Sequence, residues 1–387
     1  MKMRMTQLKT IADIQTGPFG SQLHKEDYVE TGTPIVTVEH LGNRVFTEQN
    51  LPRVSDSDKA RLIKYTLSTG DIVFSRVGSV DRCSYVDKSH DGWMFSGRCL
   101  RVRPTELVDS LYLYYYFCLE ETKQFVRNIA VGATMPSINT KLLGEVEIAL
   151  PDLNNQKRIA AVLSSLDDKI ENNQKLNDNL ADLLQTIYQE RFGNDILAVN
   201  QGVLSDICSY SRDKVAVSEL NVITYFSTEN MLSGKAGSTE ATSLPTTSQT
   251  TACHKGDTLI SNIRPYFKKI VYCEDKCGCS TDVLCFTPSQ PCYSAYLFST
   301  LYADKFFAFM VAGSKGTKMP RGDKQQIMTY PVVLPSEEEL AGFNTIASPL
   351  LEQIYSNRAE NKRLSILRDT LLPKLMSGEI NVSAVQL

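Results

Sequence analysis

Residues 159–187 read IAAVLSSLDDKIENNQKLNDNLADLLQTI, and the regular spacing of their apolar side chains is the strongest structural signal in the chain. A repeat of 3.5 residues, sustained over about four heptads, is typical of a coiled-coil seam. An ordinary amphipathic core helix is the alternative, but it has a wider stripe with a period of 3.6 residues. The seam is formed by Ile159, Leu163, Leu166, Ile170, Asn173, Asn177, Leu180, Leu184 and Ile187.

A second stretch repeats this seam 184 residues later, from Phe343 to Leu371, and its polar positions recur at the same places. A buried asparagine costs stability and fixes the register of a coiled coil. We therefore predict two coiled-coil helices that are partners of each other. Their register would be set by Asn173, Asn177, Asn357 and Asn361.

The rest of the chain is also duplicated. The segment 70–76 (GDIVFSR) matches 256–262 (GDTLISN), and Met135-Pro136 matches Met319-Pro320, with a glycine three residues before each methionine. An internal repeat of this kind indicates two copies of one domain. Short β-branched runs and an aromatic helix in each half predict an α+β fold with mixed α/β domains. The predicted parts are a first domain at 1–150, a central helix at 151–193, a second domain at 194–334, a C-terminal helix at 335–378 and a tail at 379–387.

The short connection after the first helix predicts that the second helix runs back along it. The helices would then be antiparallel, with an approximate twofold axis between them. Under this symmetry Asn173 faces Asn361 and Asn177 faces Asn357. A 29-residue helix is about 40 Å long, and one turn of B-DNA is about 34–36 Å. A rigid rod of this length between two similar domains would hold two sites about one turn of B-DNA apart, although such a spacer would serve any extended partner.

Composition limits the class of protein. The chain has 387 residues, 42% of them hydrophobic and 22% charged, which is typical of a globular protein with two or three domains. Its net charge of −3 means that any nucleic-acid surface is a local patch. No signal peptide or membrane span is recognisable, so we expect a cytoplasmic protein with reduced thiols. The ten cysteines include no paired C-x-x-C spacing, and we expect no metal site.

Several motifs resemble those of one family, the specificity subunits of type I restriction-modification systems. The resemblance covers essentially the whole chain, and the duplicated order of domain and helix is its most specific feature. The motifs are TGPFGS at 16–21, GTP at 32–34, GDIV at 70–73, RVGS at 76–79, QKRIA at 156–160, NIRPY at 262–266 and LPKLMSGEI at 372–380.

The resemblance implies a bipartite DNA target. Each domain resembles a target recognition domain that reads one half of a split sequence in double-stranded DNA. The helices resemble spacers that dock two methyltransferase subunits, through which restriction subunits join the complex. S-adenosylmethionine and ATP are then expected on those partner subunits, and this chain has no cofactor of its own.

The sequence agrees with a non-catalytic role. It contains no phosphate-binding G-x-x-x-x-G-K-[ST] loop and no H-E-x-x-H or G-x-S-x-G motif. The segment 262–266 resembles the Asn-Pro-Pro-Tyr motif of adenine methyltransferases but has the wrong length. Asp167 and Asp168 lie off the seam, and we interpret them as a solvated face rather than an acid–base pair.

DNA recognition needs cations for the phosphates and side chains that reach base edges. Single surface cations are usually solvated, so the predictions depend on clusters. The run RPYFKK at 264–269 interleaves basic and aromatic residues, as expected for a surface that follows a nucleic-acid backbone. The candidates are Ser21, Lys25, Arg76, Ser79, Arg82, Arg98, Thr134 and Lys141 in the first domain, and Arg264, Tyr266, Lys268, Lys269, Lys315, Lys318 and Arg321 in the second.

Three other functions are consistent with parts of the pattern. A coiled-coil scaffold that joins two protein-binding domains would show no salt-sensitive binding of nucleic acid. A fused restriction-modification enzyme is disfavoured by the missing catalytic motifs. A spare specificity subunit, which redirects an existing modification complex, has the same sequence features as the leading hypothesis.

Overall fold

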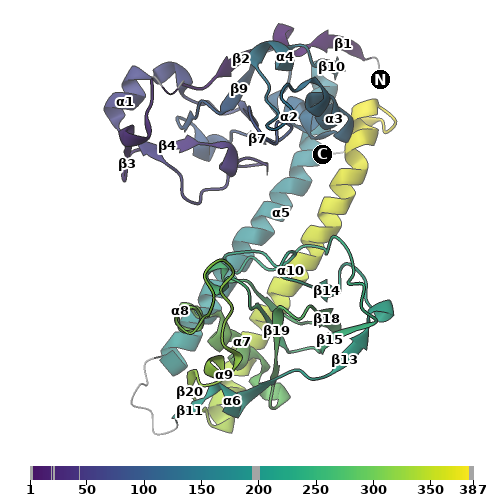
Figure 1. Cartoon of the computed structure of the whole chain (residues 1–387). Helices are drawn as coiled ribbons and strands as arrows, with labels where there is room; N and C mark the ends of the chain where they lie inside the picture. Colours follow the sequence, from purple (N-terminus) through teal and green to yellow (C-terminus); the bar gives the residue numbers. More distant parts are fainter. Residues whose placement is uncertain (1–2, 19, 21, 43, 194–200, 383–387) are drawn as a thin grey trace. The chain divides into compact units, whose positions relative to one another are not determined.

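The computed structural model describes residues 3–18, 20, 22–42, 44–193 and 201–382 (Figure 1). The start of the predicted second domain, at 194–200, and the last five residues of the predicted tail lie outside this part. The chain divides into two compact units, one formed by Met1–Glu171 with Asn361–Leu387 and the other by Asn172–Glu360. Each unit therefore contains one α+β domain and a segment of each long helix.

The described strands of the first unit form two four-stranded sheets and one two-stranded pair. Their bounds are β1 Arg4–Gln7, β2 Ala12–Thr16, β3 Tyr28–Val29, β4 Thr33–Val36, β5 Arg53–Val54, β6 Ile72–Ser75, β7 Cys83–Tyr85, β8 Met94–Phe95, β9 Cys99–Pro104 and β10 Glu147–Leu150. The antiparallel sheet has the order β2-β9-β6-β7, and the other sheet has the order β3-β5-β4-β8. Strands β1 and β10 form the pair, which joins the two ends of the domain.

The second unit repeats this plan. Its strands are β11 Gln201–Val203, β12 Cys208–Tyr210, β13 Lys214–Ala216, β14 Tyr225–Phe226, β15 Gln249–Cys253, β16 Thr258–Ser261, β17 Ile270–Tyr272, β18 Cys277–Cys279, β19 Val283–Pro288 and β20 Pro331–Val333. The order β12-β19-β16-β17 matches β2-β9-β6-β7 strand for strand, and β11 pairs with β20 as β1 pairs with β10. The predicted duplication is confirmed at the level of topology.

Helices cover the antiparallel sheet in each unit. The first unit contains α1 Asp56–Arg61, α2 Ser110–Cys118, α3 Glu120–Ile129 and α4 Thr140–Gly144, and the second contains α6 Leu204–Ile207, α7 Ser294–Tyr302, α8 Asp304–Ala312 and α9 Lys324–Ile327. The aromatic helix of each half buries its rings against the sheet. Phe74 of β6 lies edge-on against Phe117 of α2, with centroids 4.7 Å apart, and Phe286 of β19 packs with Phe306 of α8.

The two long helices are α5 Leu153–Tyr188 and α10 Glu337–Ser377. In the first unit Ile159 and Leu163 of α5 share a core with Leu372 of α10. In the second unit Leu184 of α5 shares a core with Phe343 of α10. The start of each helix thus packs against the end of the other, and the predicted antiparallel arrangement is confirmed (Figure 1).

The seam asparagines lie between the helices. Asn177 and Asn357 are buried, and the side-chain amide of Asn357 donates to Oδ1 of Asn177 at 2.9 Å, as predicted. Asn173 donates to Glu360 at 2.7 Å within the second unit, and Asn361 donates to the carbonyl of Ile170 at 3.1 Å within the first. Because Asn173 and Asn361 belong to different units, their predicted pairing stays a prediction, as does the register role of the four asparagines.

The helix starts follow their sequence signals. Asp152 accepts from the backbone N–H of Asn155 at 3.0 Å. Ser336 and Glu339 form a reciprocal capping box before α10. Pro373 would be expected to end or kink α10, but the helix does not end there: it continues to Ser377, and Gly378 follows with a φ of +78°. Burial of the side chains beyond the proline in the core of the first unit outweighs the lost hydrogen bond.

The interpretation of Asp167 as a solvated residue was also wrong. Its side chain is 6% exposed, accepts from the Tyr115 hydroxyl at 2.6 Å and pairs with Arg368 of α10 at 2.7 Å. Burial, followed by the negative charge of Asp167, raises the pKa of Tyr115. Asp168 is half exposed and pairs with Arg44 of the first domain. The helix has a second contact face, toward its domain, which a seam between two helices does not reveal.

Candidate DNA interface

In the first domain, several predicted DNA-contact residues gather at the turn between β6 and β7. The backbone N–H of Arg76 donates to the carbonyl of Arg98 at 2.8 Å, so these two residues are neighbours, and the Arg76 guanidinium donates to the carbonyl of Gly97 at 3.0 Å. The N–H of Gly78 donates to the carbonyl of Pro136 at 2.8 Å, and the loop with Thr134 therefore lies beside the turn. Ser79, Arg98 and Thr134 are exposed here.

The other candidates of this domain are held against the protein backbone, lie away from this turn or lie outside the described residues. Arg82 ends the turn, but its guanidinium donates to the carbonyl of Leu41 and is held against the protein backbone. Lys141 is exposed on α4, a few residues beyond the turn loop. Ser21 lies outside the described residues, as does the side chain of Lys25, whose backbone begins a short 3-10 turn.

The second domain has the same construction, with more charge. The N–H of Arg264 donates to the carbonyl of Pro320 at 2.8 Å, as Gly78 does to Pro136. This bond joins the turn between β16 and β17 to the loop at 315–321, and Ile263 and Arg321 form a further bridge. All seven predicted residues of this domain therefore lie on two adjoining segments. They are Arg264, Tyr266, Lys268, Lys269, Lys315, Lys318 and Arg321.

Acidic side chains hold several of these cations in place. Lys315 pairs with Asp323 at 2.6 Å, and Arg321 pairs with Asp282 at 3.3 Å. Lys318 is exposed and has no ion pair in the part of the chain that the structure describes. Since the cations of this surface outnumber its carboxylates, it has a local positive charge although the whole chain is slightly acidic.

Two further residues belong to this surface or its support, and sequence analysis missed both. Lys235 pairs with Asp304 at 2.7 Å, and Asp304 also binds Lys268 at 3.0 Å. Hydrogen bonds from Lys235 and then Lys268 lower the pKa of Asp304. Arg358 of α10 packs on Gly237 of the same loop, where a Cβ atom would lie 3.0 Å from its guanidinium carbon. The polar composition of this loop gives no signal of these long-range contacts.

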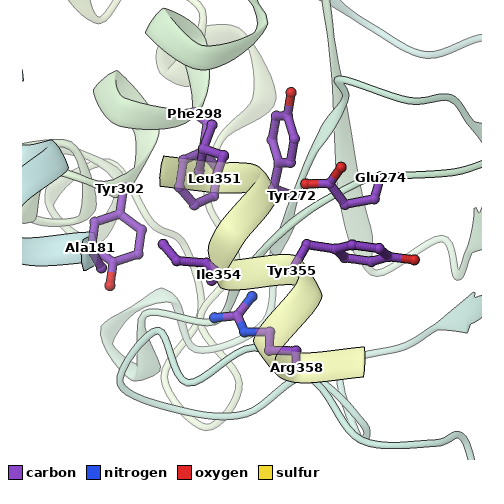
Figure 2. Close-up of a pocket in the computed structure, with 9 residues that line it drawn as sticks. All are labelled: Ala181, Tyr272, Glu274, Phe298, Tyr302, Leu351, Ile354, Tyr355 and Arg358. Carbon is purple, nitrogen blue, oxygen red and sulfur yellow. The ribbon is translucent and has the colours of Figure 1, made fainter. Parts of the chain in front are cut away.

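A small pocket lies between the second domain and α10 (Figure 2). Phe298, Tyr302 and Tyr355 line it, together with Glu274 and Arg358. Its volume of about 30 Å³ is room for a water molecule, whereas ligand sites usually measure about 300–1,000 Å³. The pocket is therefore too small for a nucleotide cofactor. Burial raises the pKa of the Glu274 carboxyl at its edge.

The cysteines of the second domain gather in its core. Cys253, Cys273, Cys277, Cys279 and Cys285 are all buried in one cluster, and the Sγ atoms of Cys273 and Cys277 are 3.5 Å apart. Within the described residues, no set of three or more His, Cys, Asp or Glu side chains has an arrangement that could hold a metal ion. Likewise, no described helix is long and apolar enough to cross a membrane.

Comparison with known proteins supports the class that the motifs indicated. Residues 2–181 match the family model of the type I restriction modification DNA specificity domain. Over 323 residues the chain is 26% identical to the type I restriction enzyme MjaIX specificity subunit of Methanocaldococcus jannaschii, covering 72% of this chain and 71% of that relative. The HindI specificity subunit of Haemophilus influenzae is 26% identical over 158 residues, which are 40% of this chain and 34% of the relative.

A solved structure supports the fold over nearly the whole chain. The type I restriction-modification S subunit from M. genitalium aligns with a TM-score of 0.59 at 17% identity, covering 97% of this chain and 96% of that one. Together with the family-model match over residues 2–181, this confirms the resemblance of the chain to type I specificity subunits.

Proposed function

We propose that this chain is the non-catalytic specificity subunit of a type I restriction-modification complex in the cytoplasm. It reads one half of a split DNA sequence with each of its domains. The observation that carries this proposal is the turn common to both domains, tethered through Gly78 in one and Arg264 in the other to a proline carbonyl. The backbone frame is the same, while the exposed side chains differ. Two readers of this kind recognise two different half-sites.

Phosphate contacts and base contacts have separate sources on this surface. Exposed cations such as Lys318 and Arg98 neutralise phosphates and set the salt dependence of binding. Side chains on the turns themselves, such as Ser79 and Tyr266, are the candidates for contact with base edges. The target sequence is then determined mainly by the turns and the loops beside them.

The long helices dock two methyltransferase subunits, which carry S-adenosylmethionine, and restriction subunits with ATP join through them. Support comes from large apolar side chains that α5 leaves in solvent. Leu176 and Leu183 are 43% and 46% exposed, and their spacing of seven residues places them on one helix face. We expect Leu183→Glu to abolish co-purification with the methyltransferase, whereas Asp182→Ala, on a neighbouring exposed polar position, retains it.

The decisive experiment is co-expression with a methyltransferase subunit, followed by single-molecule mapping of methylated adenine in host DNA. Methylation in a split motif with a fixed gap supports the proposal. Exchange of the second domain for that of a relative should change one half of the motif and leave the other half unchanged. A stable complex without new methylation would favour the alternative of a scaffold that joins two protein-binding domains.

A further inference from the structure

The corresponding turns of the two domains differ at their tips. The connection 76–82 between β6 and β7 has seven residues, and the connection 262–269 between β16 and β17 has eight. Val80 of the first turn is 2% exposed and packs in the core. Tyr266 and Phe267 of the second turn are 50% and 38% exposed, with ring centroids 4.7 Å apart. Among the described residues of these turns, the aromatic rings at the tip belong to the second domain.

The backbone of the second turn is held in an unfavourable conformation. Arg264 and Lys268, which flank the Pro-Tyr-Phe tip, both have a φ of +51°. At the position of Arg264 the first domain has Gly78, with a φ of +75°. A left-handed backbone suits glycine and is disfavoured for a long side chain. Such strain persists where the surrounding structure enforces it, and it is concentrated at functional sites.

Neighbouring segments enforce this conformation. The backbone N–H groups of Gly234 and Lys235 donate to the carbonyls of Phe267 and Lys268, at 2.8 and 2.9 Å. Asp304 binds the ammonium groups of Lys235 and Lys268 at 2.7 and 3.0 Å. The tip is therefore organised before any partner arrives. In the part of the chain that the structure describes, the Tyr266 hydroxyl has no hydrogen-bond partner.

We infer that the Tyr266 ring is an aromatic wedge in the DNA half-site read by the second domain: it enters between two neighbouring bases, unstacks them and stacks on one of them. Exposed aromatic rings stack on bases, and apolar side chains that enter a base step deform the duplex. The cations around the ring, including Lys268 and Lys318, suit a phosphate backbone on either side. Because the ring is surrounded by positive charge, a nucleic acid is a more suitable partner for it than an apolar groove of a protein. The inference rests on the proposed function and adds a deformation step to one of its two domains.

The test uses the complete complex with its methyltransferase subunits and the duplex target found by methylation mapping. Tyr266→Ala should weaken binding by about tenfold to hundredfold, the range for loss of one base–aromatic stack. Tyr266→Phe keeps the ring and should restore binding. Phe125→Ala is the matched control, since Phe125 is an aromatic residue of the first domain with 43% exposure, and it should leave affinity unchanged.

A fluorescent adenine analogue, 2-aminopurine, placed at successive positions of the half-site locates the unstacked step. Binding of the wild-type complex should raise the fluorescence of 2-aminopurine at a single base step that is distinct from the methylated adenine. Tyr266→Ala should remove only this increase. A single-base gap at the same step should strengthen binding by the wild type but not by Tyr266→Ala, because the gap removes the need to unstack. This signature separates a wedge from a structural role of the tyrosine.

Three outcomes overturn the inference. Tyr266→Ala could bind DNA as the wild type does, or the fluorescence could be unchanged at every step. The variant could instead lose its methyltransferase subunits on size-exclusion chromatography, which would assign the ring to a protein contact. In each case a split methylation motif made by the wild type leaves the proposed function standing. Failure of the proposed function itself would appear as the absence of that motif.

Discussion

The adjacent pair Asp167 and Asp168 offers a test of how the long helices are attached to the first domain. The substitution Asp167→Ala removes the acceptor for Tyr115 and the partner of Arg368, both inside the first unit. Removing one member of a buried, hydrogen-bonded ion pair costs about 3–5 kcal/mol. The cost here should lie near 3 kcal/mol, because Arg368 is 30% exposed and retains Asp369 as a second partner.

Asp168→Ala is the matched control on the next residue of the same helix. Asp168 is 53% exposed, and its partner Arg44 also lies 3.6 Å from Glu171. The Arg44 side chain is 16% exposed, but it keeps Glu171 and the carbonyl of Ser164 as partners. Because the carboxylate that is removed is solvated, this variant should lose only about 1 kcal/mol or less. Asp167→Asn keeps an acceptor for the Tyr115 hydroxyl and should fall between the two.

Urea unfolding followed by the fluorescence of Trp93, the single tryptophan of the chain, reports on the first unit. The free energy of unfolding should separate the two alanine variants by about 2–3 kcal/mol, with equal denaturant slopes. Equal losses for Asp167→Ala and Asp168→Ala would refute the reasoning. They would mean that the buried contacts with Tyr115 and Arg368 contribute no more than a surface ion pair.

Three further predictions concern the seam and the candidate interface. Asn357→Leu leaves the buried amide of Asn177 without its partner and should lower the free energy of unfolding in urea by about 1–3 kcal/mol. The double variant Asn177→Leu, Asn357→Leu should regain most of this loss. Additive effects of the two single substitutions would contradict the prediction. Lys318→Ala should lower the slope of log affinity against log salt by about one unit, while Lys276→Ala, on a paired surface lysine, leaves it unchanged. The lowered pKa of Asp304 means that its support of the turn is present above the unfolded pKa of about 3.9 and is lost as pH falls through the folded value. The stability difference between wild type and Asp304→Asn should accordingly vanish in acid, and a difference that persists at low pH would contradict it.

Much of the helix pair could be predicted because its information is local and periodic. A seam at heptad spacing determines which residues face the partner helix, and Asn177 and Asn357 meet as expected. Asp167 was misread because its partner Tyr115 comes from another part of the domain. A periodic pattern identifies the helix face that packs in the seam, but it does not show a second face that contacts the domain. Pro373 does not end α10 for a related reason: local propensity favours a stop there, and packing of the following turn overrides it.

In the candidate interface, only the loops whose sequence signals recur in both halves of the chain could be predicted. The glycine and Met-Pro signals of each half correctly indicated equivalent loops, because a tethered turn needs those residue types locally. Lys235 carried no signal, since its segment is polar, lacks periodicity and reaches the turn only through tertiary contacts. The conformation of Arg264 was equally hidden, because an arginine is not a residue that predicts a left-handed backbone.

On the proposed function, the conformation of Arg264 and the contacts of Lys235 explain how one domain plan can read two different half-sites. The bond from the turn N–H to a proline carbonyl is the same in both domains, so the position of the turn is conserved between them. In the first domain the turn then folds inward at Val80, and in the second it projects Tyr266. One added residue and a supporting loop accompany this change, and the strand order of the sheet beneath is the same in both domains. On the proposed function, new targets therefore arise by changing what a fixed turn presents, while the helices and their docking surface are retained.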